Sequence, residues 1–276
     1  MPGLYIVATP IGNLGDITAR AGAMLARADL IAAEDTRVTA KLLAHLGVRV
    51  PMTPYHDHSD ERTRAALVAR MADDVVVLVS DAGTPLISDP GYKLVRDARA
   101  AGRHVATLPG PCAAIAAITL SGLPSDRFLF AGFLPSKAKA RADTLAEFAG
   151  LRATLVFYES GPRLSSALAA MAAGLGDREA AVAREISKMF EECVTGTLTE
   201  LAARYADAPP KGEIVVVVGP PGEAVPEKAD DAALDAALRD AMADKPVAQA
   251  AKAVAKRFGL DRRDIYARAL TLKDAG

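Results

Sequence analysis

Cysteine, long apolar runs and an excess of charge of either sign are scarce or missing in this sequence. The two cysteines, Cys112 and Cys193, form no disulfide or metal-binding pattern, which is compatible with a reducing compartment. No apolar run approaches the roughly 18 residues that a membrane span requires, so we expect no membrane partner. The first residues also lack the basic region and apolar core of a signal peptide, and we expect a cytoplasmic protein.

The charge balance restricts how the chain can bind nucleic acid. With 33 basic and 34 acidic side chains, the net charge is −1. Proteins that bind bare nucleic acid through charge alone are strongly basic, so any nucleic-acid site on this chain must be local.

The chain has ample material for a core, since 51 % of its 276 residues are hydrophobic. Its clearest element is the apolar run at 75–79, which predicts a strand buried on both faces. A loop rich in glycine and proline follows, and a helical pattern resumes at Tyr92. Ligands in open parallel sheets lie at the carboxyl ends of strands, and Asp81 is the first carboxylate after this one. The alternative is an ordinary strand-to-helix turn with Asp89 as the helix cap.

The same junction recurs three times in the first 120 residues. Apolar runs at 4–8, 29–33 and 103–108 each end in a polar or glycine-rich and proline-rich loop that precedes a helical pattern. The glycines of the first loop, at 9–16, fit neither the dinucleotide fingerprint nor a P-loop. Alternating strands and helices predict a mostly parallel sheet.

Two polar clusters in this half allow two interpretations each. Residues 34–37 either cap a helix, with Asp35 as the N-cap and Arg37 solvated, or form a charged wall of a cleft. The cluster at 53–58 contains two histidines and an aspartate, which could bind a metal. The sequence contains no further cluster of cysteine or histidine residues that would support metal binding. We therefore favour a surface loop near a substrate and predict no metal site.

The second half predicts a separate set of elements. A boundary at 122–126 is followed by apolar runs that predict strands in a mixed sheet, and 220–222 ends this part. From Asp230 onward the pattern is helical throughout. We therefore expect two α/β domains, at 1–122 and 123–222, and a helical extension at 223–276. The extension is either a solvated appendage or an accessory nucleic-acid contact through its basic residues, Lys252, Lys256, Arg257, Arg262, Arg263 and Arg268.

Several motifs, taken in order, resemble those of one known family, the tetrapyrrole-methylase (class III) S-adenosylmethionine methyltransferases. The resemblance covers about residues 3–219, and its specificity comes from the order of the motifs rather than from any one of them. One departure is Gly161 and Pro162, where the family more often has Pro-His after Glu-Ser. The motifs lie at 4–14, 33–37, 80–85, 88–91, 123–124, 126–128, 132–135, 157–160 and 188–192.

The resemblance implies a homodimer of two-domain α/β subunits, with S-adenosylmethionine in a cleft between the domains. By position in the family's motifs, the expected cofactor contacts are Pro10, Asp81, Gly83, Thr84, Cys112, Ala113, Tyr158, Ile186 and Ile214.

Within the family, the motifs are most similar to the branch that methylates the ribose 2′-hydroxyl of a cytidine in 16S rRNA of the small ribosomal subunit. A ribose hydroxyl is a weak nucleophile, so a base or a cation should assist it, and Glu159 and Lys188 are our catalytic candidates. The alternatives are a methyltransferase acting on a small tetrapyrrole and a non-catalytic cofactor-binding module. The expected substrate-binding residues are Glu34, Asp35, Arg37, His56 and Arg163.

Overall fold

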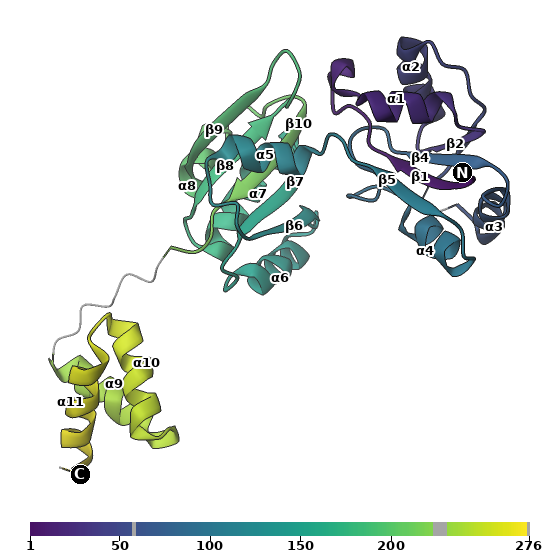
Figure 1. The fold of residues 1–276 in the computed structure, drawn as a ribbon. Coiled ribbons are helices and arrows are strands. Elements are labelled where there is room, and N and C mark those ends of the chain that lie inside the picture. Colours follow the sequence, from purple (N-terminus) through teal and green to yellow (C-terminus); the bar gives the residue numbers. More distant parts are fainter. Residues whose placement is uncertain (57–58, 223–230, 275–276) are drawn as a thin grey trace. The chain divides into compact units, whose positions relative to one another are not determined.

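The structure is a computed structural model that describes residues 1–56, 59–222 and 231–274 (Figure 1). It divides into two compact units, Met1–Pro220 and Pro221–Gly276. Asp57 and His58, which belong to the polar cluster considered above as metal ligands, lie outside the described residues.

The first sheet is parallel throughout, as the alternation of strands and helices predicts. Its strands are arranged in the order β3-β2-β4-β1-β5. The short edge strand β3 was not predicted, because its three residues include Pro54 and are only partly buried, so they give little strand signal. The strands are β1 (Gly3–Val7), β2 (Leu30–Ala33), β3 (Met52–Pro54), β4 (Val75–Val79) and β5 (Val105–Leu108).

Helices cover both faces of this sheet, which explains why its strands are almost uniformly apolar. One face packs against α1 (Ala19–Ala26) and α2 (Thr36–Leu46). The other packs against α3 (Glu61–Arg70) and α4 (Tyr92–Ala100). A 3₁₀ turn, η1 (Leu14–Asp16), precedes α1.

Two predictions about helix caps have different outcomes. Asp35 is the N-cap of α2 and accepts a hydrogen bond from the backbone N–H of Arg37, so the capping interpretation is confirmed. The alternative interpretation of the loop after β4, with Asp89 as the helix cap, is wrong. The residue before α4 is Gly91, whose φ of 138° suits a glycine, and no side chain caps that helix.

The second sheet is mixed, as predicted, with the order β6-β7-β10-β8-β9. Only β6 and β7 run parallel, and the other neighbours are antiparallel. Its strands are β6 (Phe128–Phe133), β7 (Thr154–Ser160), β8 (Glu179–Arg184), β9 (Glu192–Thr197) and β10 (Glu213–Val218).

The helix α5 (Ala113–Ser121) follows a strand of the first sheet but packs on the second sheet (Figure 1). Its buried side chains contact Val156, Val215 and Val217. The opposite face of that sheet packs against α6 (Ala138–Phe148), α7 (Gly161–Leu175) and α8 (Leu198–Arg204). We propose that the chain passes between the sheets at 109–112, rather than at the predicted boundary after residue 122. This crossing brings the start of α5 beside the second sheet.

The second unit is helical throughout its described residues, as predicted. It consists of α9 (Asp231–Asp244), α10 (Val247–Phe258) and α11 (Arg262–Asp274) around a small apolar core. Over the whole described chain, no helix has the length and apolar character needed to span a bilayer.

Candidate active site

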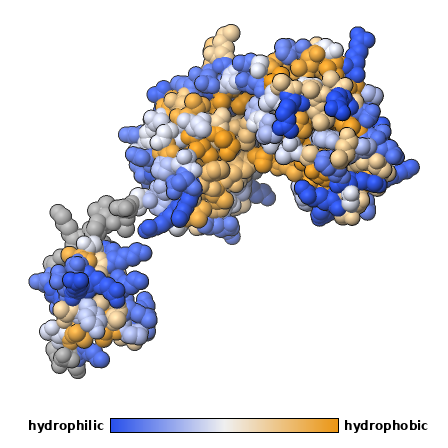
Figure 2. Space-filling view, viewed as in Figure 1, coloured by the Kyte–Doolittle hydropathy of each residue, from blue (hydrophilic) through white to orange (hydrophobic). Residues whose placement is uncertain are grey.

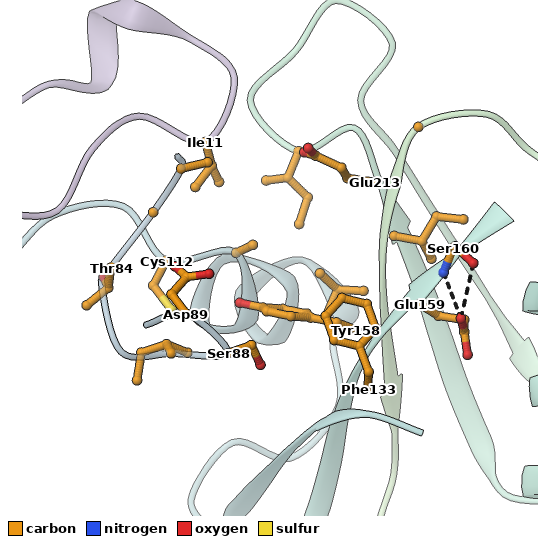
Figure 3. Close-up of a pocket in the computed structure, with 18 residues that line it drawn as sticks. Ile11, Thr84, Ser88, Asp89, Cys112, Phe133, Tyr158, Glu159, Ser160 and Glu213 are labelled. Atoms are coloured by element: carbon orange, nitrogen blue, oxygen red, sulfur yellow. Dashed lines mark hydrogen bonds between the residues drawn. The ribbon is translucent and has the colours of Figure 1, made fainter. Parts of the chain in front are cut away.

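A cavity of about 360 Å³ lies where the loops of the first sheet meet the second sheet (Figure 3). The loop after β4 forms one side, and the start of α5 lies beside it. Strand ends of the second sheet form the rest of the wall. Its lining comprises Ile11, Ala82, Gly83, Thr84, Ile87, Ser88, Asp89, Cys112, Ala113, Phe133, Tyr158, Glu159, Ser160, Ile186, Gly212, Glu213, Ile214 and Val215.

Backbone hydrogen bonds join the strand-end loops that form the first side of this cavity. The backbone groups of Thr9 and Gly83 form a pair of hydrogen bonds of 2.8 and 3.0 Å, which join the loops after β1 and β4. Thr84 donates its hydroxyl to the carbonyl of Pro111, 3.0 Å away, and so holds the loop before α5. Gly83 has a φ of 77°, and a Cβ there would meet Ile11 at 3.3 Å, so the close approach requires glycine.

An aromatic cluster forms the second-sheet side. The centroid of the Tyr158 ring lies 4.9 Å from that of Phe130 and 5.6 Å from that of Phe133, and both pairs pack edge to face. Burial, together with the nearby thiol of Cys112, raises the pKa of Tyr158 to about 12. Tyr158 therefore carries a neutral hydroxyl near pH 7 and cannot act there as a phenolate base.

A second cavity, of about 320 Å³, adjoins the first. The two share Ile11, Ala82 and Glu213. Its other lining residues come from the loop after β1, from α2, from the end of β4 and from the loop between β8 and β9: Thr9, Pro10, Gly12, Leu14, Val38, Thr39, Lys41, Leu42, Ser80, Asp81 and Lys188.

Asp81, which lines this second cavity, is hydrogen-bonded to Glu34 and Asp35, which follow β2 and line neither cavity. Asp81 accepts a hydrogen bond from the backbone N–H of Asp35 (2.9 Å), and its own N–H donates to Glu34 (3.2 Å). Arg37 donates to both oxygens of Asp35, and this pairing lowers the pKa of Asp35 to about 2. The structure thus brings Glu34, Asp35 and Asp81 together, while Arg37 is occupied by Asp35.

Lys188 lies at the border of the two cavities and is held by two carboxylates. Its ammonium group is 2.8 Å from Glu185 and 2.9 Å from Glu213. Burial works against the charge, but these hydrogen bonds outweigh it and raise the pKa of Lys188. The aliphatic stem covers Gly12, where any Cβ would overlap the lysine side chain. Lys188 is therefore a fixed, protonated cation beside the second cavity.

Glu159 is part of the wall of the first cavity, but its carboxylate lies on the other side of β7. Because side chains alternate along β7, Tyr158 faces the cavity and the Glu159 carboxylate points towards the helical face, where only 1 % of the side chain is exposed (Figure 3). It accepts from the backbone N–H of Ser160 (2.8 Å) and pairs with Arg163 (3.3 Å), which donates to the carbonyl of Leu134. The expectation that Glu159 faces the cleft is corrected, because the strand extends through Ser160 instead of ending before Glu159.

The remaining predicted residues line the second cavity or neither cavity. Pro10 and Asp81 line only the second. The predicted substrate-binding residues Glu34, Asp35, Arg37, His56 and Arg163 line neither, and the backbone N–H of His56 donates to the Ser59 hydroxyl. Sequence reasoning missed Glu213, because the charged residue that starts β10 looked like a strand boundary. Among the described residues, no group of three or more histidine, cysteine, aspartate or glutamate side chains could hold a metal ion. The first cavity gathers Gly83, Thr84, Cys112, Ala113, Tyr158, Ile186 and Ile214.

Comparisons with known sequences give consistent matches. The family described as Tetrapyrrole (Corrin/Porphyrin) Methylases matches residues 3–202, and the RsmI C-terminal HTH domain matches residues 228–273. A protein named Ribosomal RNA small subunit methyltransferase I from Erythrobacter litoralis (strain HTCC2594) is 59 % identical over 272 residues, covering 99 % of this chain and 96 % of that protein. The protein of the same name from Escherichia coli O157:H7 is 44 % identical over 273 residues, covering 97 % and 94 %.

Solved structures share the fold at lower sequence identity. Uroporphyrin-III-C-methyltransferase from Thermus thermophilus has a TM-score of 0.57 and 21 % identity, covering 79 % of this chain and 94 % of that chain. Diphthine synthase has a TM-score of 0.60 and 17 % identity, covering 78 % and 89 %. A structure of the Thermus enzyme complexed with S-adenyl homocysteine has a TM-score of 0.54 and 21 % identity, covering 79 % and 97 %.

Proposed function

Because the chain belongs to the tetrapyrrole (corrin/porphyrin) methylase family, and within it to the relatives named ribosomal RNA small subunit methyltransferase I, we propose that it transfers a methyl group to ribosomal RNA. The methyl donor is S-adenosylmethionine, and the acceptor is the ribose 2′-hydroxyl of a cytidine in 16S rRNA. The substrate is the small ribosomal subunit, and the enzyme works as a homodimer.

The observation that carries this proposal is the pair of adjoining cavities with different linings. The first is mostly apolar and suits the adenosine part of the cofactor, while carboxylates such as Glu213 suit its positive groups. S-adenosylmethionine has no phosphate group. This agrees with the sequence of the loop at 9–16, which fits neither the dinucleotide fingerprint nor a P-loop. The charged wall of the second cavity, with Lys41, Asp81 and Lys188, suits a nucleotide better than a broad apolar tetrapyrrole.

The mechanism assigns the two cavities to donor and acceptor. S-adenosylmethionine, when bound, supplies a methyl group on a sulfonium sulfur for an in-line displacement. An acceptor hydroxyl at the shared border would lie beside the Lys188 ammonium, which stabilises the negative charge that develops on the oxygen. Glu213 lines both cavities and accepts the proton. Glu159 and Arg163 act structurally, on the far face of β7.

Transfer of labelled methyl to small ribosomal subunits that lack the modification tests the function. We expect label in 2′-O-methylcytidine after nucleoside analysis. Label in another nucleoside, or bound cofactor without any transfer to subunits, would refute the assignment. Parallel reactions with a tetrapyrrole acceptor test the alternative function, because methyl transfer to the tetrapyrrole would indicate a tetrapyrrole methyltransferase.

The pH dependence of kcat tests the protonation state of Lys188. Since its pKa is raised, the cation persists through the neutral range and is lost only as the pH rises through that raised value. We therefore expect no Lys188-dependent change in kcat between pH 7 and 9, measured at saturating cofactor and subunits. A fall in kcat over this range that disappears in Lys188→Arg would show that Lys188 titrates there, contrary to this prediction.

A further inference from the structure

The solvent-exposed side of α11 carries a continuous stripe of basic, aromatic and apolar side chains. Helical residues advance by 100° each, so Arg262, Tyr266, Leu270 and Lys273 fall on one flank of the helix, beside the buried Ile265. Arg263 lies at the outer edge of the same flank. We call these five residues the α11 stripe.

The apolar members of the α11 stripe are unusually open to solvent for their size. Tyr266 is 40 % exposed and Leu270 is 39 % exposed, although the core of this unit lies one helix face away. Figure 2 shows a largely hydrophilic surface on the visible face of the C-terminal helices. Exposed rings set among cations are typical of surfaces that bind single-stranded nucleic acid.

The charges of this unit are arranged so that the α11 stripe keeps its positive potential. The acidic residues Asp231 and Asp235 of α9 are paired with Arg268, at 2.5 Å each, on the other flank of α11. Asp261 is turned to the backbone N–H of Arg263. Within the described residues, no ion pair involves the side chains of the α11 stripe. The α11 stripe itself therefore contains three cations and no carboxylate, on a chain whose net charge is −1.

We propose that the α11 stripe is an RNA-binding surface, at which the arginines and lysine contact phosphates and the Tyr266 ring stacks on a base or packs on a ribose. This inference rests on the proposed function, and it deepens it by naming a second place, outside the two cavities, where the RNA is held. Charge complementarity selects RNA over a second copy of this nearly neutral chain. Arg262 and Arg263 lie at one end of the α11 stripe and Lys273 at the other, so cations flank Tyr266 and Leu270.

A triple variant, Arg262→Ala with Arg263→Ala and Lys273→Ala, tests the phosphate contacts in the full-length protein. We expect KM for small subunits to rise about tenfold with kcat at saturation unchanged, and the slope of log Kd against log salt to fall by about two. The matched control removes exposed cations of the same unit that lie outside the predicted nucleic-acid contact, with Arg239→Ala and Lys245→Ala. It should change KM by less than twofold.

Tyr266→Ala tests the ring separately and guards against misfolding of the triple variant. We expect about fivefold weaker binding of subunits with an unchanged salt slope, and near-normal binding by Tyr266→Phe. The inference is overturned if the wild-type protein methylates subunits but the triple variant and Tyr266→Ala match the control. It is also overturned if the triple variant changes only the oligomeric mass. Absence of methylation by the wild-type protein would instead refute the proposed function.

Discussion

Replacement of Lys188 by methionine should lower kcat for subunit methylation about a hundredfold while the affinity for S-adenosylmethionine stays within a few fold. The ammonium group is fixed by Glu185 and Glu213 beside the acceptor cavity, so it needs no reorganisation to stabilise charge on the reacting oxygen. Removing one such preorganised donor typically costs about 10²–10³ in kcat. Cofactor affinity, measured by calorimetry, should change little because Lys188 does not line the first cavity.

Two further variants separate this role from a purely structural one. Loss of the cation leaves two carboxylates close together, which could disturb the loop by repulsion. Combining Lys188→Met with Glu185→Gln removes that repulsion, so a structural defect would be relieved and a catalytic one would persist. Lys188→Arg keeps the charge and should retain most of the activity. If Lys188→Met keeps a third of the wild-type kcat, the proposed role of the ammonium group is wrong.

The sequence predicts those parts of this site that depend on local pattern. Apolar β-branched runs such as Val75–Val79 identify the buried strands, and the loops that follow them identify the edge of the sheet where the cavities lie. Lys188 could be placed near the site for the same reason, because it lies just beyond β8. Its role as a fixed cation could not be predicted, since that depends on Glu213, 25 residues further along the chain, meeting the local pair of Lys188 and Glu185.

The parts that could not be predicted depend on tertiary packing. The apolar helix α5 reads clearly as a helix, but no local signal says that it covers the second sheet instead of the first. Glu159 was assigned to the cleft because the strand was expected to end at Tyr158, two residues too early. Glu159 is still part of β7, so its side chain alternates with that of Tyr158 and its carboxylate lies on the opposite face.

Gly161→Ala should reduce the stability of the first unit by about 3 kcal/mol, because a Cβ at this position would overlap the carbonyl oxygen of Pro210. Gly161 is the first residue of α7 and is buried, so the clash is with backbone and cannot be relieved by a rotamer change. A loss of this size should lower Tm by about 10 °C in a unit of this length, as measured by thermal unfolding. Gly150→Ala is the matched control, because its Cβ would meet nothing within 4 Å and its Tm should stay nearly unchanged.

The same substitution should also weaken cofactor binding, which connects this glycine to the site. Pro210 is separated only by Lys211 from Gly212 and Glu213, which line the first cavity, so displacing its carbonyl shifts that wall. The family's more frequent Pro-His at 161 and 162 would bring a Cβ to the same point. Accommodating it therefore requires a different path for the segment before β10. If Gly161→Ala has the Tm and cofactor affinity of Gly150→Ala, the close packing of Gly161 against Pro210 does not constrain the site.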